Sequence, residues 1–401
     1  MSVKTVLISG AGIAGPTLAY WLLQYGFEPT IVERAPSFRD GGYVIDFWGL
    51  GYDVAEKMNL IADLKCRAYK ADQVSLVNRN GNKVGGFTTE IVQSSMSGRF
   101  LSILRSDLAA AIYQTVADKV ETIFGESIKS IEEYEQGVEV SFQNESKRRF
   151  DLVVGSDGLH SVVRNLTFGP ESQFEKKLGY VAASFTANNY LPRDEGVYAC
   201  YSSPGKQIAR FALRDNKTVF FLVYSTKDWL EGQYLEDKFD GAQLYKAKLE
   251  AVFGGDGWEC KSILEAMHSC NDLYFDSVSQ IHMPTWSKGR TALVGDAAYC
   301  PSLLAGQGSA LAMAGSYILA GELKKANGDH VAAFRSYEHQ LKAFIEQKQK
   351  AAENFGKWFA PETTFAIFTR NQITKLFSIP LIAKKMVNDS IADKFNLCDY
   401  T

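Results

Sequence analysis

The chain has 401 residues, of which 46% are hydrophobic and 22% charged, and its formal net charge is −3. This balance excludes global disorder, and the lack of a basic excess argues against a dedicated nucleic-acid binder. Its six cysteines and five histidines show no spacing typical of a zinc, iron–sulfur or redox-disulfide site, so we expect no bound metal and a reducing, cytoplasmic location.

The chain begins with a strand, a glycine turn, a helix and a second strand. We predict a buried parallel strand over Thr5–Ser9, a helix over Thr17–Tyr25 and another strand over Pro29–Val32. The glycines before the helix would break the helix of a signal peptide. No later stretch is apolar over the roughly 18 residues that a membrane span requires. We therefore expect neither a signal peptide nor a transmembrane helix.

The sequence Gly-Ala-Gly-Ile-Ala-Gly at residues 10–15 joins the first strand to the helix. In such a turn Gly10 permits the sharp change of direction, Gly12 lets the backbone approach a pyrophosphate, and Gly15 lets the helix pack closely on the strand. The helix N-terminus adds free N–H groups, and Glu33 at the tip of the second strand can accept ribose hydroxyls. A structural glycine turn is the alternative. The motif predicts dinucleotide binding by Gly10, Gly12, Ile13, Ala14, Gly15 and Glu33.

Residues 53–175 carry the next elements and a second motif. We expect a hairpin over residues 74–87, and helices and strands over Asp53–Met58, Ala62–Leu64, Ser106–Ala117, Glu121–Phe124, Ile128–Tyr134, Val138–Phe142 and Arg149–Val154. The last strand runs into an Asp-Gly turn at Asp157, followed by His160 and Arg164. A strand, a turn and a helix need no ligand, so this motif alone does not indicate a function.

From about residue 176 to 276 the pattern changes to the alternating strands of an antiparallel sheet, with helices over Ala242–Phe253 and Lys261–Ala266. Aromatic side chains on these strands could contact a flat organic substrate, although ordinary core packing explains each of them more readily. Arg210 lies on one face of its strand and could hold an acidic group; a solvated arginine is the alternative. Pocket candidates in this region are Phe185, Tyr190, Tyr198, Tyr201, Arg210, Phe211, Phe220 and Phe221, and we select Phe185, Tyr201, Arg210 and Phe220 as the substrate-binding residues.

A third motif follows a predicted strand at Arg290–Val294. It reads Gly-Asp-Ala-Ala from residue 295 and continues to a Gly-Gln-Gly turn at residues 306–308, before helices over Ser309–Lys325 and Val331–Phe355. A carboxylate at a strand tip beside a glycine-rich helix start can hold ribityl hydroxyls and a pyrophosphate. Tyr299 lies in this motif and is a further pocket candidate.

These three motifs, in this order and spacing, make the chain similar to the flavoprotein aromatic hydroxylases, the group A monooxygenases with the p-hydroxybenzoate hydroxylase fold, over about residues 3–345. Within that family the chain resembles the tetracycline-inactivating monooxygenases at residues 41–46, 295–301 and 317–323. It departs from the family at Ala310 and Gly315, where Asn and Asp are usual.

The resemblance implies bound FAD, NADPH as a transient reductant and O₂ as the co-substrate. It implies oxygen transfer from a flavin C4a-hydroperoxide, so that the flavin and no side chain carries the chemistry. The expected function is hydroxylation or oxidative inactivation of a tetracycline-type antibiotic. Alternatives are oxidation of another phenolic or polyketide substrate, an FAD-dependent reductase of the same fold, or a flavin-binding partner protein. Beyond the glycine motif, the resemblance places at the cofactor Arg34, Arg105, Asp157, Gly295, Asp296, Pro301, Gly306 and Gly308.

The fold class that the resemblance implies is α/β. A Rossmann-like FAD-binding domain in three parts (residues 1–72, 101–175 and 277–345) is interrupted by a substrate-side hairpin (73–100) and an antiparallel-sheet substrate domain (176–276). An extra C-terminal segment, 346–401, is expected to bridge the domains with helices, with Trp358 and Phe368 nearest the pocket. Plain packing and a membrane-surface helix are the alternatives. We expect a monomer that binds neither nucleic acid nor, stably, a membrane.

Overall fold

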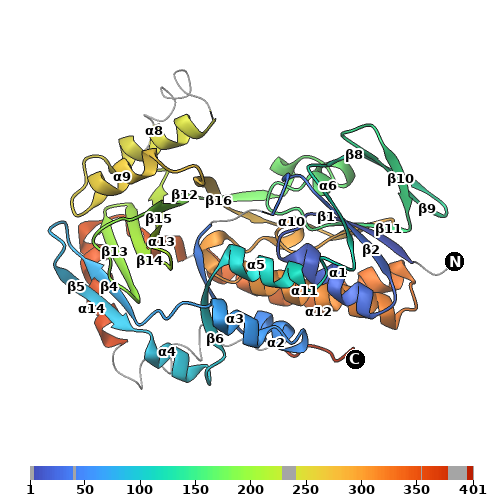
Figure 1. Ribbon diagram of the computed structural model, residues 1–401, viewed down its shortest axis with the longest axis horizontal. Helices are drawn as coiled ribbons and strands as arrows, with labels where there is room; N and C mark the ends of the chain where they lie inside the picture. Colours follow the sequence, from blue (N-terminus) through green and yellow to red (C-terminus); the bar gives the residue numbers. More distant parts are fainter. Residues whose placement is uncertain (1–3, 39–41, 228–240, 354, 378–394, 401) are drawn as a thin grey trace.

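The computed structural model describes residues 4–38, 42–227, 241–353, 355–377 and 395–400. The chain forms two units that lie side by side, one at the right and one at the left of Figure 1. The right-hand unit holds the N-terminal strand and most of the long helices, and the left-hand unit is built on an antiparallel sheet. Within the described residues, no helix is long and apolar enough to cross a membrane.

A six-stranded sheet lies at the centre of the right-hand unit, in the order β17-β18-β11-β1-β2-β7. Its strands are β1 (Thr5–Ser9), β2 (Glu28–Glu33), β7 (Glu121–Phe124), β11 (Leu152–Gly155), β17 (Ser287–Lys288) and β18 (Thr291–Leu293). All except β17 run parallel. The carboxyl ends of β1, β11 and β18 therefore meet at one edge, and each of these three strands leads into one of the three motifs.

The main helices of this unit pack on the six-stranded sheet or on one another. They are α1 (Ala14–Gln24), α2 (Leu50–Lys57), α3 (Ile61–Arg67), α5 (Arg105–Gln114), α6 (Val162–Thr167), α10 (Asp296–Tyr299), α11 (Gly308–Lys325) and α12 (His330–Ala352). α11 is buried along most of its length because small residues let it pack against both α1 and α2. Leu7, Leu18 and Ile318 are fully buried in this core.

Two small sheets and a short helix complete the right-hand unit and its boundary. The strands β8 (Ile128–Tyr134), β9 (Gly137–Phe142) and β10 (Lys147–Phe150) form one sheet, and β3 (Val44–Trp48) pairs with β6 (Phe100–Leu104) in the other. The helix α4 (Glu90–Ser95) precedes β6. β3 and β6 lie between the two units, so they help to form the boundary of the site described below.

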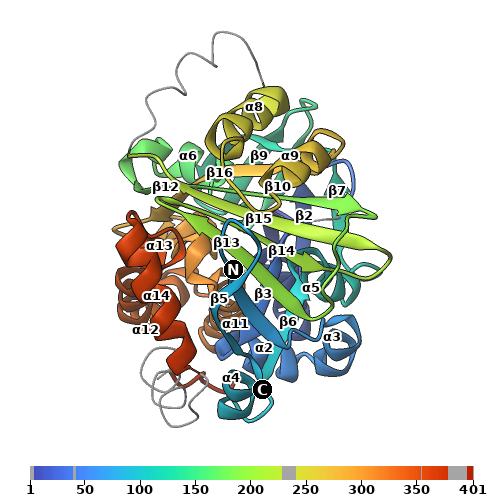
Figure 2. The same ribbon diagram turned by 90° about the vertical axis from the view of Figure 1, so that its left-hand side faces the viewer.

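The left-hand unit is a seven-stranded sheet in the order β16-β12-β15-β14-β13-β4-β5. Its strands are β4 (Gln73–Val77), β5 (Lys83–Thr88), β12 (Glu175–Asn188), β13 (Val197–Ser203), β14 (Lys206–Ala212), β15 (Lys217–Ser225) and β16 (Tyr274–Ile281). Figure 2 shows α8 (Gly241–Phe253) and α9 (Cys260–His268) above this sheet. These helices cover one face, and the other face is turned toward the right-hand unit.

The strands β12 and β16 continue out of the sheet and reach the right-hand unit (Figure 1). At the sheet end Ser184 pairs with Tyr274, and at the other end Glu175 pairs with Ile281. Ile281 is fully buried in the core of the right-hand unit. The register of the ladder shifts between Lys177 and Val181. A two-stranded ribbon therefore connects the units.

The C-terminal segment contacts both units. Its helices are α13 (Phe355–Phe359) and α14 (Thr364–Leu376), and α14 packs on β5 and β13. A Cβ on Gly85 of β5 would lie 2.7 Å from the Asn371 carbonyl oxygen, so glycine permits this close approach. Residues 395–400 pack on the right-hand unit, where the Tyr400 ring lies 5.3 Å from that of Tyr317.

The helix α14 has a polar buried face and an apolar exposed face. Arg370, Asn371 and Thr374 are at most 7% exposed, whereas Phe365 is 79% and Phe368 59% exposed. Hydrogen bonds more than apolar contacts therefore hold this helix on the sheet.

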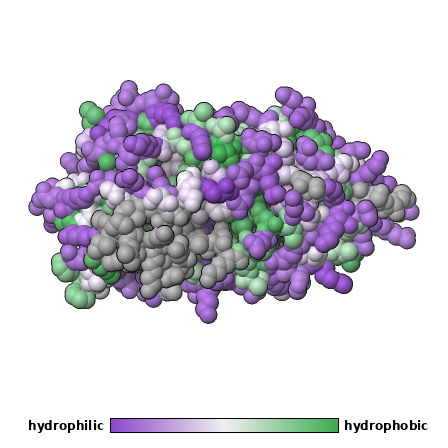
Figure 3. All heavy atoms as spheres, turned by 90° about the horizontal axis from the view of Figure 1, so that it is seen from below, coloured by the Kyte–Doolittle hydropathy of each residue, from purple (hydrophilic) through white to green (hydrophobic). Residues whose placement is uncertain are grey.

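Figure 3 shows that hydrophilic residues dominate the face of the molecule seen from below, with hydrophobic residues in smaller groups.

Candidate cofactor and substrate site

The first and second motifs pack directly on each other at the carboxyl ends of β1 and β11. A Cβ on Gly10 would lie 2.7 Å from the Ser156 carbonyl oxygen, and Gly10 has a φ of +105°. A Cβ on Gly15 would lie 2.0 Å from the Gly10 carbonyl oxygen. These two glycines thus serve the close packing of α1 on the strands.

Gly12 faces open space, unlike the other two glycines of the motif. Within 4 Å, a Cβ at this position would meet only Nη2 of Arg105, at 3.9 Å. No side chain caps the N-terminus of α1, whose N-cap is Ile13, so the N–H groups of its first turn are available as donors. Donors, a positive helix end and a nearby guanidinium are the groups that a pyrophosphate requires.

Glu33 is fixed at the tip of β2, beside the first motif. Its Oε2 accepts a hydrogen bond from the Ala11 N–H and its Oε1 from the Ala35 N–H, both at 2.8 Å. The carboxylate is only partly buried, so it can accept further bonds from ribose hydroxyls. Arg34 is exposed beside it.

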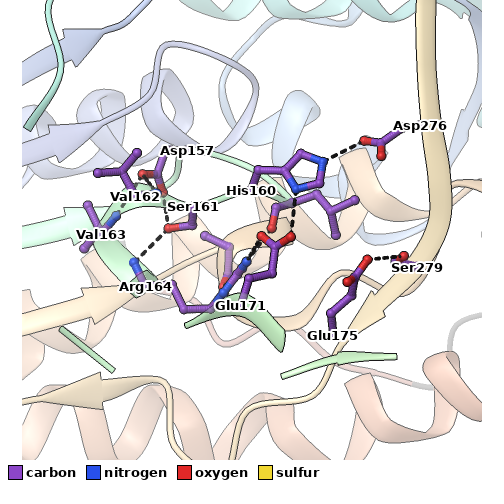
Figure 4. Close-up of polar contacts among 12 residues, drawn as sticks. Asp157, His160, Ser161, Val162, Val163, Arg164, Glu171, Glu175, Asp276 and Ser279 are labelled. Carbon is purple, nitrogen blue, oxygen red and sulfur yellow. Dashed lines mark hydrogen bonds and ion pairs between the residues drawn. The ribbon is translucent and has the colours of Figure 1, made fainter. Parts of the chain in front are cut away.

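Asp157 of the second motif caps α6 (Figure 4). Its Oδ2 accepts from the Val162 and Val163 N–H groups at 2.9 and 3.1 Å, and its Oδ1 accepts from the Ser161 hydroxyl at 2.5 Å. Burial raises the pKa of this carboxyl above its ordinary value. The cap explains why an aspartate stands here, and a contact with the cofactor stays a prediction.

A chain of charges runs from the second motif to the ribbon between the units (Figure 4). The fully buried Arg164 donates from Nη2 to Glu171 Oε2 at 2.6 Å and from Nη1 to the Ala297 carbonyl oxygen at 3.0 Å. His160 places Nδ1 2.9 Å from Glu171 Oε1 and Nε2 2.9 Å from Asp276 Oδ2. Ionised carboxylates only accept, so both ring nitrogens donate and the imidazole is protonated.

We expect His160 to make the stability of the protein depend on pH. Hydrogen bonding to Asp276, opposed by burial and aided by Glu171, raises its pKa from 6.5 to about 9. Because the pKa of His160 is higher in the folded state, its protonation stabilises the folded protein. This stabilisation is fully present below pH 6.5 and is lost as the pH rises to about 9. Because the ring is half-exposed and solvent screens it, we expect a loss of about 1 kcal/mol.

Urea unfolding at pH 6.5 and pH 9 checks this expectation, with His160→Gln as the comparison. The other titrating groups cancel in the difference between the two proteins. The wild type should lose about 1 kcal/mol more unfolding free energy than the variant over this range. Equal losses in the two proteins would show that the histidine does not act as a cation here.

The third motif brings Asp296 beside the N-terminus of α11. Its Oδ1 would lie 3.5 Å from a Cβ on Gly308, and no side chain caps that helix end. Burial raises the pKa of Asp296, and the charge of Arg105 opposes the rise. The charges of Arg105 and Asp296 also act on Tyr43, whose pKa is raised by burial to about 12.

Taken together, these groups fit FAD. Open space at Gly12, uncapped ends on α1 and α11, and carboxylates at two strand tips suit the two phosphates and the ribose and ribityl hydroxyls. Two further residues predicted at the cofactor differ in burial. Gly306 is exposed, whereas Pro301 is buried and its carbonyl oxygen accepts a hydrogen bond from Gln280.

The prediction that places Tyr299 at the pocket is wrong, because this side chain lies in the core. It is 1% exposed, its hydroxyl lies 3.2 Å from that of Tyr337, and its ring contacts Trp286. A Cβ on Gly315 would lie within 1.9 Å of the Tyr299 hydroxyl oxygen. Tyr299 therefore fills the space that a side chain at residue 315 would need, which explains why glycine stands where the family usually has aspartate.

The sheet face turned toward the right-hand unit consists of three rows of side chains, set by the strand register. The first row is Ala182, Val223, Gln207 and Ser202; the second is Ser184, Phe221, Ala209 and Cys200; the third is Thr186, Val219, Phe211 and Tyr198. The C-terminal helices pack against the first row, and β3, β6 and Tyr69 pack against the third. The second row lies between these contacts, and Ser202 and Tyr198 of the flanking rows stay partly exposed.

The name recess is used here for the space above the second row that Tyr43, Phe221 and Tyr274 border. The rings of Tyr43, Phe221 and Tyr274 stay partly exposed there, with the Tyr43 ring 5.9 Å from Phe221 and 6.0 Å from Tyr274. Asp46 is exposed beside them, and its Oδ1 accepts a hydrogen bond from the Ser102 hydroxyl at 2.7 Å. Sequence reasoning missed Tyr43, Asp46 and Tyr274, although two of them follow the glycines at residues 41 and 42.

The structure places the four substrate candidates of the sheet on the opposite face. Phe185, Tyr201 and Phe220 pack under α8 and α9, with the Phe185 and Phe220 rings stacked at 4.8 Å. Arg210 is 4% exposed and pairs with Glu259 at 2.8 Å and Asp194 at 2.7 Å. The expectation that this arginine is free to hold a substrate is therefore wrong, because two carboxylates already neutralise it.

The C-terminal candidates Trp358 and Phe368 do not point into the recess. Trp358 stacks on Phe377 at 6.3 Å, and Phe368 lies on the exposed face of α14. The ring from this segment that reaches the second row is Phe359, at 6.4 Å from Phe221.

Comparison with known proteins agrees with this geometry. The model of the FAD binding domain family matches residues 4–352. An uncharacterized protein of Mycobacterium tuberculosis is 39% identical over 357 residues, which cover 86% of this chain and 92% of that protein. A flavin-dependent monooxygenase of an unknown prokaryotic organism is 36% identical over 364 residues, with 88% and 89% covered. The crystal structure of the tetracycline destructase Tet(55) has a TM-score of 0.83 and 32% identity, and the match covers 99% of both chains.

Proposed function

The chain belongs to the FAD binding domain family and is an FAD-dependent monooxygenase; from this premise we propose that it oxidises a tetracycline or a related aromatic polyketide, with NADPH as the reductant and O₂ as the co-substrate. The observation that carries the proposal is the recess beside the third motif, in a chain that matches a tetracycline destructase along its whole length. The rings of Tyr43, Phe221 and Tyr274 contact one another there and offer an aromatic surface against which a flat, multi-ring molecule can pack.

When bound, FAD supplies the oxygen-transfer chemistry. The side chains hold and orient the reactants. Glu33 would accept hydrogen bonds from the ribose hydroxyls and Asp296 from the ribityl hydroxyls, and Arg105, whose Nη2 lies near Gly12, would pair with the phosphates. Tyr43, Phe221 and Tyr274 exclude water and hold the substrate ring against the sheet.

The test is a screen of NADPH oxidation by the purified flavoprotein with tetracycline, 4-hydroxybenzoate and catechol, with the product mass read for each. We expect tetracycline to stimulate oxidation and to gain one oxygen atom. The same reaction without O₂ separates an oxygenase from a reductase, because only a reductase turns over. Gain of oxygen by the simple phenols alone would assign the enzyme to another substrate class.

A further inference from the structure

Arg370 of α14 lies buried against the first row of the sheet with neutral acceptors only. The side chain is 5% exposed. Its Nη1 donates to Gln207 Oε1 at 3.0 Å and to the Phe359 carbonyl oxygen at 3.1 Å, and its Nη2 donates to the Ser202 hydroxyl at 3.1 Å. The remaining acceptors are the Trp358 carbonyl oxygen and the side-chain oxygen of Asn371.

This positive charge is not neutralised. Among the described residues, no carboxylate lies within ion-pair distance of Arg370, whereas the buried Arg210 has two carboxylate partners. Burial accordingly lowers the pKa of Arg370 from its ordinary value. A buried cation without a counter-charge costs free energy, and the cost falls when an anion comes close.

The field of this guanidinium reaches the recess. Cys200 lies in the second row, and the charge of Arg370 lowers the pKa of this thiol, which burial raises to about 11. Gln207 accepts from Arg370 and from Ser202 through the same oxygen, Oε1. The amide nitrogen on the same carbon is therefore turned away from the cation, and among the described residues no acceptor takes its two N–H donors, which stay available for a ligand.

We propose that Ser202, Gln207 and Arg370, here called the cationic end, bind an anionic oxygen group of the substrate, a carboxylate or an ionised enol on an aromatic ring system. This proposal rests on the proposed function. Gln207 contacts the anion and Arg370 supplies the charge behind it. At the other end of the recess Tyr198 and Asp46 offer a phenol and a carboxyl for neutral hydroxyls. Tyr198 and Ser202, at the two ends, are four positions apart on β13, which is about 13 Å and matches the length of about three fused rings.

The test compares two probes of the same shape, anthraquinone-2-carboxylate and anthraquinone-2-carboxamide. Their binding to the oxidised holoenzyme is followed by flavin fluorescence without NADPH, so no turnover is needed. We expect the wild type to bind the carboxylate at least about tenfold more tightly than the carboxamide. Gln207→Glu should remove this preference, because the new carboxylate pairs with Arg370 and repels the anion while α14 stays docked.

Two further variants control for indirect effects. Gln372→Glu makes the same change on the exposed face of α14 and should keep the preference. Arg370→Met should abolish it with flavin content unchanged. Equal binding of the two probes by the wild type, no binding of either, or a preference retained in Gln207→Glu would overturn the proposal. Failure to oxidise tetracycline would instead overturn the proposed function, because probe binding is measured without the reaction.

Discussion

Replacing Gly12 with aspartate is expected to give a folded, colourless protein that no longer binds FAD. The new side chain has room, since a Cβ there meets only Arg105 Nη2 at 3.9 Å. Its carboxylate would occupy the space in front of the uncapped N-terminus of α1 and pair with the guanidinium. A pyrophosphate then meets a like charge and loses its cation, so we expect affinity to fall at least about a hundredfold.

The ratio of flavin absorbance to protein absorbance measures the loss, and circular dichroism shows whether the fold persists. Gly255→Asp is the matched control, because Gly255 is exposed, has no atom within 4 Å of its Cβ position and needs no positive φ. That variant should stay yellow. A Gly12→Asp protein that is as yellow as its parent would contradict the placement of the pyrophosphate.

Tyr400→Ala is expected to destabilise the protein by about 3–5 kcal/mol, although the residue lies at the C-terminal end of the chain. Tyr400 is 8% exposed, and Gly321 of α11 provides the space for its ring, since a Cβ there would lie within 2.3 Å of it. Its hydroxyl donates to Glu322 Oε1 at 2.7 Å. The substitution removes a buried ring and leaves the buried carboxylate of Glu322 without this donor.

Denaturant unfolding measures this effect. Tyr400→Phe keeps the ring and loses only the hydroxyl, so it should cost about 1–2 kcal/mol. Tyr134→Ala, which removes a tyrosine that is 49% exposed, should change the free energy of unfolding by less than about 1 kcal/mol. An unfolding curve of Tyr400→Ala that overlays the wild type would mean that the last residues do not belong to the core.

Local sequence signals predicted the strands that carry the cofactor motifs, while the contacts of the cofactor residues stay predictions. The strand over Thr5–Ser9 has the predicted bounds, and Glu33 ends the next strand as expected. The turn after β1 must bring the main chain, the N-terminus of a helix and a carboxylate close together, and few residue types allow this. The binding chemistry can therefore be predicted from residues that are close in sequence. The FAD-binding family and the fold class are confirmed.

The substrate half could not be predicted in the same way, because both faces of the seven-stranded sheet are buried and aromatic. Phe220 and Phe221 are neighbours on one strand, but the first packs under α8 and α9 and the second faces the recess. Alternation separates the two faces without saying which one meets the cofactor domain. That assignment depends on contacts with distant segments, such as Tyr43 and Phe359.

Arg370 and Gln207 show a second reason. They lie 163 positions apart in the chain and meet only because α14 returns to the edge of the sheet. The apolar residues of α14 suggest a buried hydrophobic face, whereas in the structure its polar residues are the buried ones. A helix held mainly by side-chain hydrogen bonds does not show the hydrophobic periodicity from which packing is predicted.

The ribbon of β12 and β16 has a mechanical consequence. Its main-chain ladder has one paired end at Ser184 and Tyr274 and the other at Glu175 and Ile281, and a bulge between Lys177 and Val181 interrupts it. Swinging the sheet away from the cofactor would break ladder hydrogen bonds or pull Ile281 from its core, each at a cost of kilocalories. The paired ends therefore resist separation of the two units, and bending of the ribbon is expected at the bulge, where ladder hydrogen bonds are missing.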